Sequence, residues 1–208
     1  MKGQLRTIMG EVAALRPVYT NTGDSTEIIL INGNVVPDPR SIRSIYRILA
    51  RFYAVDLVAA RQHYRKLLGQ ANGIPLPFSA QLVFCPLKMR VPRCPGDFTL
   101  GYVSYRQVAE VKDFRQGDYR CQVVLQNGIR LFSLNRAAFL QKQMALARLV
   151  ENHYLETQGV GSQWTEINIP TRAEFMLLET KLNFLLQNYI VEREKGFCFK
   201  ERNIISNS

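Results

Sequence analysis

The sequence has few residues of the kinds that bind metals or carry out redox chemistry. Its four cysteines are Cys85, Cys94, Cys121 and Cys198. No two of them form a Cys-x-x-Cys pair, and the only histidines, His63 and His153, lie far from each other in the sequence, so the spacing of zinc ligands is missing. We therefore expect no metal and no other cofactor. We expect the cysteines to be reduced thiols, most of them buried.

Long apolar runs are also missing. No run approaches the ~18 residues that a membrane-spanning helix needs. Residues 1–6 are basic, but Glu11 follows without a long apolar segment, so we expect no secretory signal and place the protein in the cytosol. With 208 residues, of which 47% are hydrophobic and 10% aromatic, the chain can bury a core in one or two domains.

The local signatures of catalysis are absent as well. The chain has no Gly-rich phosphate loop, no Gly-x-Ser-x-Gly elbow and no His-Glu-x-x-His sequence. Carboxylates are scarce between residues 40 and 130, where the acids are Asp56, Asp97, Glu110, Asp113 and Asp118. We expect no catalytic residues. A nucleic-acid-processing enzyme such as a nuclease remains the alternative, because one sequence does not show which carboxylates meet in space.

Positive charge is present in excess, and it is concentrated in the middle of the chain. Residues 1–39 carry −1, residues 40–130 carry +10 and residues 131–208 carry +1. Concentrated charge of this kind is typical of proteins that bind phosphate groups, and RNA, DNA and anionic lipid are all compatible with it. The candidate contact residues are Arg40, Arg43, Arg47, Arg51, Arg61, Arg65, Lys66, Lys88, Arg90 and Arg93. Eight of these ten are arginine, which favours nucleic acid because arginine binds phosphates bidentately and enters a narrow minor groove.

Short strands and hairpins are expected in the N-terminal part. Residues 4–9 and 11–18 indicate two short strands broken at Gly10, with a helix as the alternative. Residues 26–31 are β-branched and apolar, and an Asn-Gly turn follows them, which predicts a hairpin with a return strand through residues 35–36.

A pair of basic helices is expected next. Asp38 is suited to cap the first helix with Pro39 at its first position. Its apolar face consists of Ile42, Ile45, Tyr46, Leu49, Phe52 and Tyr53. Its opposite face is an arginine stripe with no acid to pair with it; the stripe consists of Arg40, Arg43, Arg47 and Arg51. The second helix begins at Asp56 and ends at Gly69, and the short turn between the two helices resembles a helix-turn-helix.

The rest of the chain predicts further strands and helices. Five prolines between residues 75 and 95 indicate an extended edge or crossing segment instead of a central strand, with Lys88 and Arg90 on its outer face. Strands are expected at residues 100–111, 119–125 and 129–134, and the last two are joined by a second Asn-Gly hairpin at residues 126–128. Asn135 is suited to cap a helix over residues 136–156. The fold class is therefore α+β, with antiparallel strands and hairpins, an inserted basic helical pair and C-terminal helices.

We expect two parts: an α+β DNA-binding domain over residues 1–157, with its basic region at 40–130, and a C-terminal helical segment over residues 158–208. Thr171 and Glu174 form a capping box there. Phe175, Leu178, Leu182, Leu185 and Tyr189 follow at spacings of three and four. This pattern fits either a helix that packs on its own domain or a two-heptad coiled coil used for self-association.

Three stretches together resemble the ComK family of competence transcription factors. The first covers residues 44–53 and continues through basic residues to 74–77 and 82–84. The second runs from Val123 to Arg130 and leads into the helix that follows Asn135. The third covers residues 169–177, with the sequence Ile-Pro-Thr-Arg-Ala-Glu-Phe-Met-Leu.

This resemblance implies a bacterial, sequence-specific transcription activator. Such a protein binds paired AT-rich boxes in double-stranded DNA through the minor groove, acts as a homo-oligomer and assists RNA polymerase at the nucleoid. The family's segment for an adaptor to a Clp protease falls on residues 175–180. Phe175, Met176 and Leu177 match it, whereas the next three residues do not. Major-groove contact by a helix-turn-helix is the alternative mechanism, and non-specific nucleic-acid binding is an alternative function.

Overall fold

The computed structural model describes residues 7–21 and 23–159. The larger of its two sheets has the strand order β3-β2-β1-β6-β5-β4, and all of its neighbouring strands are antiparallel. These strands are β1 (Val12–Thr20), β2 (Gly23–Leu30), β3 (Val35–Asp38), β4 (Leu76–Ser79), β5 (Leu82–Lys88) and β6 (Leu100–Ser104). The smaller sheet has the order β7-β8-β9. Its strands are β7 (Val108–Gln116), β8 (Tyr119–Leu125) and β9 (Arg130–Ser133).

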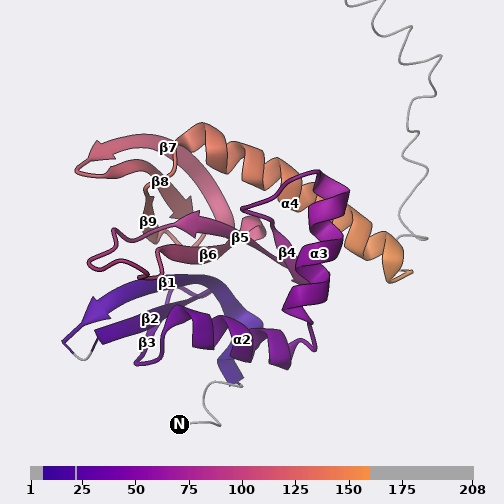
Figure 1. Ribbon diagram of the computed structural model, residues 1–208, viewed down its shortest axis with the longest axis horizontal. Helices are drawn as coiled ribbons and strands as arrows, with labels where there is room; N and C mark the ends of the chain where they lie inside the picture. Colours follow the sequence, from indigo (N-terminus) through magenta and orange to yellow (C-terminus); the bar gives the residue numbers. More distant parts are fainter. Residues whose placement is uncertain (1–6, 22, 160–208) are drawn as a thin grey trace, which may run out of the picture. The chain divides into compact units, whose positions relative to one another are not determined.

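Helices pack around both sheets (Figure 1). They are α2 (Ile42–Phe52), α3 (Leu57–Leu68) and α4 (Ala137–Thr157), with short 3-10 turns η1 (Met9–Glu11) and η2 (Tyr105–Gln107). Helix α2 contacts β1 and β2, α3 contacts β4, and α4 contacts β4 and β5 of one sheet and β7 and β8 of the other. Antiparallel sheets with helices between and after the strands confirm the predicted α+β class. No helix in the described residues is long and apolar enough to cross a membrane.

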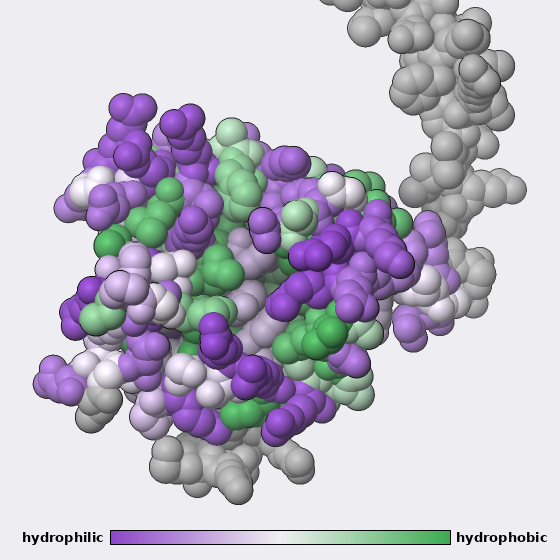
Figure 2. Space-filling model, viewed as in Figure 1, coloured by the Kyte–Doolittle hydropathy of each residue, from purple (hydrophilic) through white to green (hydrophobic). Residues whose placement is uncertain are grey.

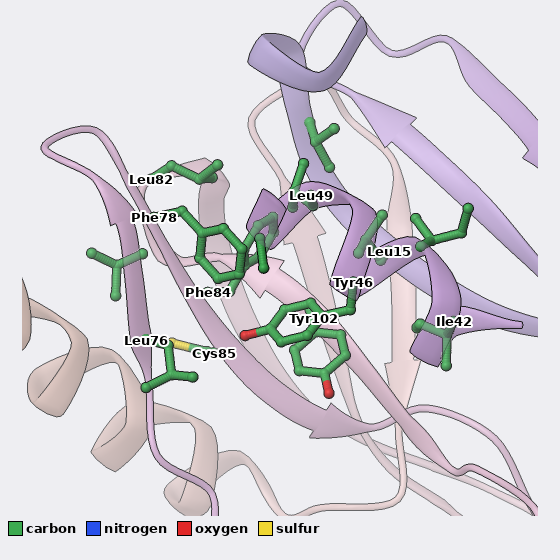
Figure 3. Close-up of a cluster of buried hydrophobic side chains, with 14 of the residues drawn as sticks. Leu15, Ile42, Tyr46, Leu49, Leu76, Phe78, Leu82, Phe84, Cys85 and Tyr102 are labelled. Atoms are coloured by element: carbon green, nitrogen blue, oxygen red, sulfur yellow. The ribbon is translucent and has the colours of Figure 1, made fainter. Parts of the chain in front are cut away.

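The larger sheet is buried on both faces, which explains why its strands are apolar at consecutive positions. Ile28 and Leu30 belong to a core cluster beneath α2, whereas Ile29 between them belongs to a cluster against the smaller sheet. Tyr102 and Val103 of β6 divide in the same way, as the alternation of side chains along a strand requires. Figure 3 shows the first cluster, where side chains of α2 meet those of β1, β4, β5 and β6.

Both predicted Asn-Gly hairpins are confirmed. Gly33 has φ +88° and Gly128 has φ +82°, backbone conformations that glycine adopts with little strain. Asn127 also links the two sheets, because its side-chain amide donates a hydrogen bond of 2.8 Å to the carbonyl of Leu30. In the N-terminal part the helical alternative holds for residues 7–11, the strand expected over residues 11–18 is present as β1, and residues 4–6 lie outside the described part.

Two predictions about helix caps were wrong. Asp38 ends β3 and binds Arg40, and α2 begins only at Ile42, with Ser41 as its N-cap. Asn135 does not cap α4, because its Oδ1 accepts hydrogen bonds from the Lys88 amide and the Ser133 hydroxyl. Asp38 and Asn135 are residue types that often cap helices, but their side-chain oxygens here accept hydrogen bonds from groups outside the helix ends.

Two predictions about strands were also wrong. Strand β5 lies between β4 and β6 although it contains Pro86. The pairing of β4 ends at Leu76, opposite Phe84, so Pro86 has a neighbouring strand only in β6 and its missing N–H is tolerated. Residues 100–111 form two strands in different sheets, because η2 separates them. Glu151 of α4 holds that turn by accepting hydrogen bonds from Tyr105 and Arg106.

The described residues end two residues after α4, and they belong to one unit of the chain. The boundary proposed at residue 157 coincides with the end of α4. Residues 160–208, with the predicted helical seam, lie outside the described part.

Candidate nucleic-acid interface

Helix α2 presents its arginines to solvent because its opposite face is fixed in the core. Ile45 and Leu49 are fully buried, whereas Arg43, Arg47 and Arg51 are exposed. These three arginines are four residues apart, so they lie along one side of the helix. Arg47 and Arg51 form no ion pair with any described residue. The predicted arginine stripe is therefore present from Arg43 to Arg51.

Helix α3 continues this positive surface. Its first turn is capped by Asp56, whose Oδ1 accepts hydrogen bonds from the amides of Val58 (2.8 Å) and Ala59 (3.1 Å). Its last residue is followed by Gly69 at φ +60°, so the predicted bounds of this helix are confirmed. Arg61, Arg65 and Lys66 are all exposed on it. Figure 2 shows hydrophilic side chains over α2 and α3.

Charge on these two helices is almost entirely of one sign. Between residues 40 and 69 the chain has seven basic side chains, and Asp56 is its single acid. The carboxylate of Asp56 is held against backbone amides and does not reach the stripe as a partner. We name the set Arg43, Arg47, Arg51 and Lys66 the outer stripe.

Arg40 does not belong to the outer stripe. It precedes α2 and binds Asp38 through its backbone amide (3.0 Å), Nε (2.8 Å) and Nη2 (2.6 Å). These hydrogen bonds lower the pKa of Asp38 and raise that of Arg40. The prediction that the first helix has no acid to pair with its arginines was therefore wrong at this residue.

Arg90 is buried, although an outer position was predicted for it. Only 6% of its surface is exposed. Its guanidinium forms an ion pair with Asp24 (2.8 Å) and donates hydrogen bonds to the carbonyls of Val18 (3.1 Å) and Phe98 (2.7 Å). It also lies over the ring of Tyr19. Arg90 thus connects β1, β2 and the loop before β6, and its charge is not available to a partner.

Arg93 is exposed in the loop between β5 and β6. Its guanidinium lies over the ring of Tyr19, 4.3 Å from the centroid. The same loop is fixed by Asp97, which accepts hydrogen bonds from the Tyr19 hydroxyl and from the amides of Arg93 and Cys94. The hydrogen bond from Tyr19 is the main reason that the pKa of Asp97 is lowered. Arg93 is therefore exposed but held in place.

The remaining predicted cations line a cleft of about 710 Å³. Arg61 and Arg65 come from α3 and Lys88 from the end of β5. Aromatic side chains make up much of the apolar lining: Tyr46, Phe98, Tyr102 and Phe139. The guanidinium of Arg43 lies over the Phe98 ring at 4.3 Å, so this edge of the cleft adjoins the outer stripe.

Tyr46 and Tyr102 stack on each other in the cleft. Their ring centroids are 3.8 Å apart and the rings are nearly parallel, at 12° (Figure 3). Burial raises the pKa of both hydroxyls. At Tyr102 the guanidinium groups of Arg61 on α3 and Arg43 on α2 oppose that rise in pKa.

No sequence pattern reveals this aromatic pair, because Tyr46 and Tyr102 are far apart in the chain. Another missed residue was Gln143, which is fully buried. Its position three residues after Leu140 and four before Ala147 places it on the inward face of α4. The spacing could therefore have predicted that Gln143 is buried.

The remaining sequence predictions concern metal ligands, cysteines, histidines and the adaptor segment. No group of three or more His, Cys, Asp and Glu side chains in the described part of the chain is placed to hold a metal ion. Cys85 and Cys121 are buried free thiols, as predicted, whereas Cys94 is exposed. The rings of His63 on α3 and His153 on α4, which are far apart in the sequence, lie 5.0 Å apart. Phe175, Met176 and Leu177, the candidate adaptor residues, lie outside the described residues.

No protein-family model matches the sequence, and neither a curated protein nor a solved structure matches the chain. The resemblance to the ComK family therefore stays a prediction.

Proposed function

We propose that the protein is a sequence-specific, DNA-binding regulator of transcription that contacts double-stranded DNA through α2 and α3. The observation that carries the proposal is the outer stripe, whose exposed cations have no carboxylate partner among the described residues. Unpaired cations along a rigid helix can neutralise successive phosphates and release counterions, which is the main source of non-specific affinity. The buried face of α2 keeps these side chains in a fixed row.

Specificity in this proposal comes from arginines that enter the narrow minor groove of AT-rich DNA. Arg43, Arg47 and Arg51 suit this role because all three are exposed on one helix. Activation through RNA polymerase and binding as a homo-oligomer are parts of the proposal that rest on the ComK resemblance alone.

The first experiment measures binding to a duplex with two AT-rich boxes and to a GC-rich duplex at two salt concentrations, with excess non-specific competitor. A preference for the AT-rich duplex that persists at the higher salt supports a sequence-specific regulator. Equal and salt-sensitive binding to both duplexes contradicts specificity and leaves only a surface for polyanions.

The second experiment tests the outer stripe directly. In the Arg47→Gln plus Arg51→Gln variant we expect weaker binding to every duplex, with a log-log salt slope that is shallower by about 2, since each phosphate contact contributes about 0.9. The matched control is Arg120→Gln plus Arg130→Gln, which removes the same charge from exposed positions on the smaller sheet. An unchanged slope in the first variant, or an equal loss in both, would contradict the role of the outer stripe.

Competition with minor-groove ligands shows whether the protein binds the minor or the major groove of DNA. Distamycin-type ligands occupy the minor groove of AT-rich DNA, so they should displace the protein if its arginines read that groove. Binding that is indifferent to these ligands favours major-groove contact by α3. Metal-dependent cutting of a labelled duplex that is lost on substitution of a carboxylate would instead indicate a nuclease.

A further inference from the structure

The cleft beside the outer stripe has the dimensions and the lining of a small-molecule site. Its volume of about 710 Å³ lies within the range of about 300–1,000 Å³ that is usual for ligand pockets. It is bounded by α3, the loop at residues 71–74, the end of β5, the start of β6 and the start of α4. Arg43 of the outer stripe lies over Phe98 at the edge of the cleft, but Arg47 and Arg51 are not part of its lining, so these two arginines can be substituted without changing the cleft.

The charged groups in the lining are all positive. Arg61, Arg65 and Lys88 line the cleft, and none of its lining residues is acidic. Arg61 and Lys88 form no ion pair with any described residue. Arg65 is positioned by a hydrogen bond of 2.9 Å from its Nη2 to the carbonyl of Ala71. An anionic group in the cleft would therefore be met by guanidinium and ammonium donors from two sides.

The start of α4 adds backbone donors on the same side as Lys88. No side chain caps this 21-residue helix at its N-cap, Arg136. The side chain of Asn135, which would otherwise do so, accepts from Lys88 and Ser133 instead. Asn135 and Phe139 both line the cleft, so the positive end of the helix faces it. Uncapped first-turn amides are suited to bind phosphate oxygens.

The apolar lining provides surfaces for a planar ring. Phe98 and Phe139 are half-buried lining residues, whereas Tyr46 and Tyr102 stack on each other and are only 4% and 7% exposed, so Phe98 and Phe139 offer the ring surfaces. Aromatic side chains bind bases by stacking without requiring a particular base. The cleft thus combines an anion site with an aromatic site.

Gln143 is a buried polar side chain next to the cleft, although it is not among the residues that line it. It is fully buried, and its Nε2 and Oε1 have no hydrogen-bond partner among the described residues. It lies directly behind two lining residues, because a Cβ placed on Gly73 would come within 3.5 Å of Gln143 Nε2 and 3.4 Å of the Phe139 ring. A buried amide without partners is costly unless another group satisfies it.

We infer that this cleft binds a nucleoside phosphate, with the phosphate near Arg61, Lys88 and the start of α4 and the base against the aromatic lining. A nucleotide fits better than a nucleic-acid strand because the site is of limited volume and is bounded by α3 on one side and α4 on another. In a DNA-binding regulator this ligand would be an effector.

The test measures binding of adenosine monophosphate and guanosine monophosphate to the full chain by equilibrium dialysis, with adenosine and inorganic phosphate as partial ligands. We expect saturable binding of at least one nucleotide, and at least tenfold weaker binding of adenosine and of phosphate. The Arg61→Gln plus Lys88→Gln variant should lose at least tenfold in nucleotide affinity. The control Lys142→Gln plus Arg148→Gln, which removes two exposed charges from α4 outside the cleft, should retain it.

Two further variants separate this inference from DNA binding and from simple anion binding. Phe98→Leu should lower nucleotide affinity at least threefold and leave phosphate binding unchanged. Arg47→Gln plus Arg51→Gln should weaken duplex binding while nucleotide binding persists, so either proposal can fail alone. Urea midpoints equal to that of the unmodified chain show that the variants are folded.

The inference is overturned if no nucleotide binds saturably, if phosphate alone binds as tightly as the nucleotide, or if the Arg61→Gln plus Lys88→Gln variant binds like its control. It is also overturned if a single-stranded oligonucleotide binds more tightly than the mononucleotide and is lost in the same variant. That last result would identify the cleft as a channel for a strand.

Discussion

The arginines of this chain differ in function according to what surrounds each guanidinium group. Arg90 satisfies two backbone carbonyls and one carboxylate inside the protein, whereas Arg47 is exposed on α2. Both residues fit a basic pattern in the sequence, yet the guanidinium of Arg90 is buried among acceptors of its own fold, whereas an exposed unpaired cation is available to a partner. Substitution of Arg90 should lower the stability of the protein, whereas substitution of Arg47 should weaken binding to a partner.

Arg90→Met should destabilise the protein by about 2 kcal/mol, because it leaves the carbonyls of Val18 and Phe98 without this donor, whereas the side chain of Asp24 is 38% exposed and can be hydrated. Arg93→Met is the matched control, since Arg93 also lies over Tyr19 but is exposed; it should cost less than about 1 kcal/mol. Urea denaturation of both variants measures the difference. Equal losses would show that Arg90 acts mainly through Tyr19.

The pairing of Asp38 with Arg40 should make stability depend on pH. Its folded-state pKa is lowered by the hydrogen bonds from Arg40, so its contribution is present above the unfolded pKa of about 4 and is lost as the pH falls through the folded value. Asp38→Asn should therefore cost about 1–2 kcal/mol at pH 7 and progressively less below about pH 4. Unfolding free energies of both proteins across this range check the prediction, with Asp118→Asn as an exposed control. A cost that does not change with pH would contradict it.

At the level of secondary structure elements, the packing of β6 between β1 and β5 depends on a residue without a side chain. A Cβ on Gly101 would lie 2.8 Å from the carbonyl oxygen of Leu15, a backbone atom of β1, and even closer to the Met89 side chain. Gly101→Ala should therefore cost about 2–3 kcal/mol through overpacking. Gly10→Ala, with no atom within 4 Å of its Cβ, should change stability by less than about 0.5 kcal/mol. Thermal unfolding compares the midpoint temperatures of the two variants. Similar midpoints would contradict the prediction and show that β6 can shift to make room for the Cβ.

Elements with a strong local pattern could be predicted from the sequence, because short-range forces determine them. The apolar spacing of α2, the cap at Asp56 and both Asn-Gly turns are of this kind. Two of the errors arose where a distant residue competes for a local group. Asn135 is engaged by Lys88, and the turn after β6 is held by Glu151, contacts that no sequence window contains.

The cleft could be predicted only in part for the same reason. Its cations Arg61, Arg65 and Lys88 were predicted as contact residues, because the charge of a side chain follows from its residue type. Its stacked rings come from α2 and β6, and its uncapped helix end depends on what Asn135 binds. These features exist only once the larger sheet has brought the segments together.

At the level of the whole molecule, the positive surface and the smaller sheet lie on opposite faces of the larger sheet. One core cluster joins α2 to the larger sheet, and the other joins the larger sheet to β8 and β9. Helix α4 contributes Val150 to the first cluster and Leu140 to the second. Both cores thus share one helix, and we expect them to unfold together.

A chain truncated after Gly159 tests whether residues 160–208 are needed for folding or for oligomerisation. It keeps both core clusters, α4 and the whole outer stripe, so it should unfold in a single transition and bind a duplex with one AT-rich box as tightly as the full chain. If the C-terminal segment mediates self-association, the truncated chain should lose the extra affinity for two boxes, because linked binding events raise avidity only while the units are joined. Sedimentation and binding to one-box and two-box duplexes measure both effects. Loss of cooperative unfolding would contradict the expected domain boundary, whereas unchanged preference for two boxes would place the oligomer contact within residues 1–159.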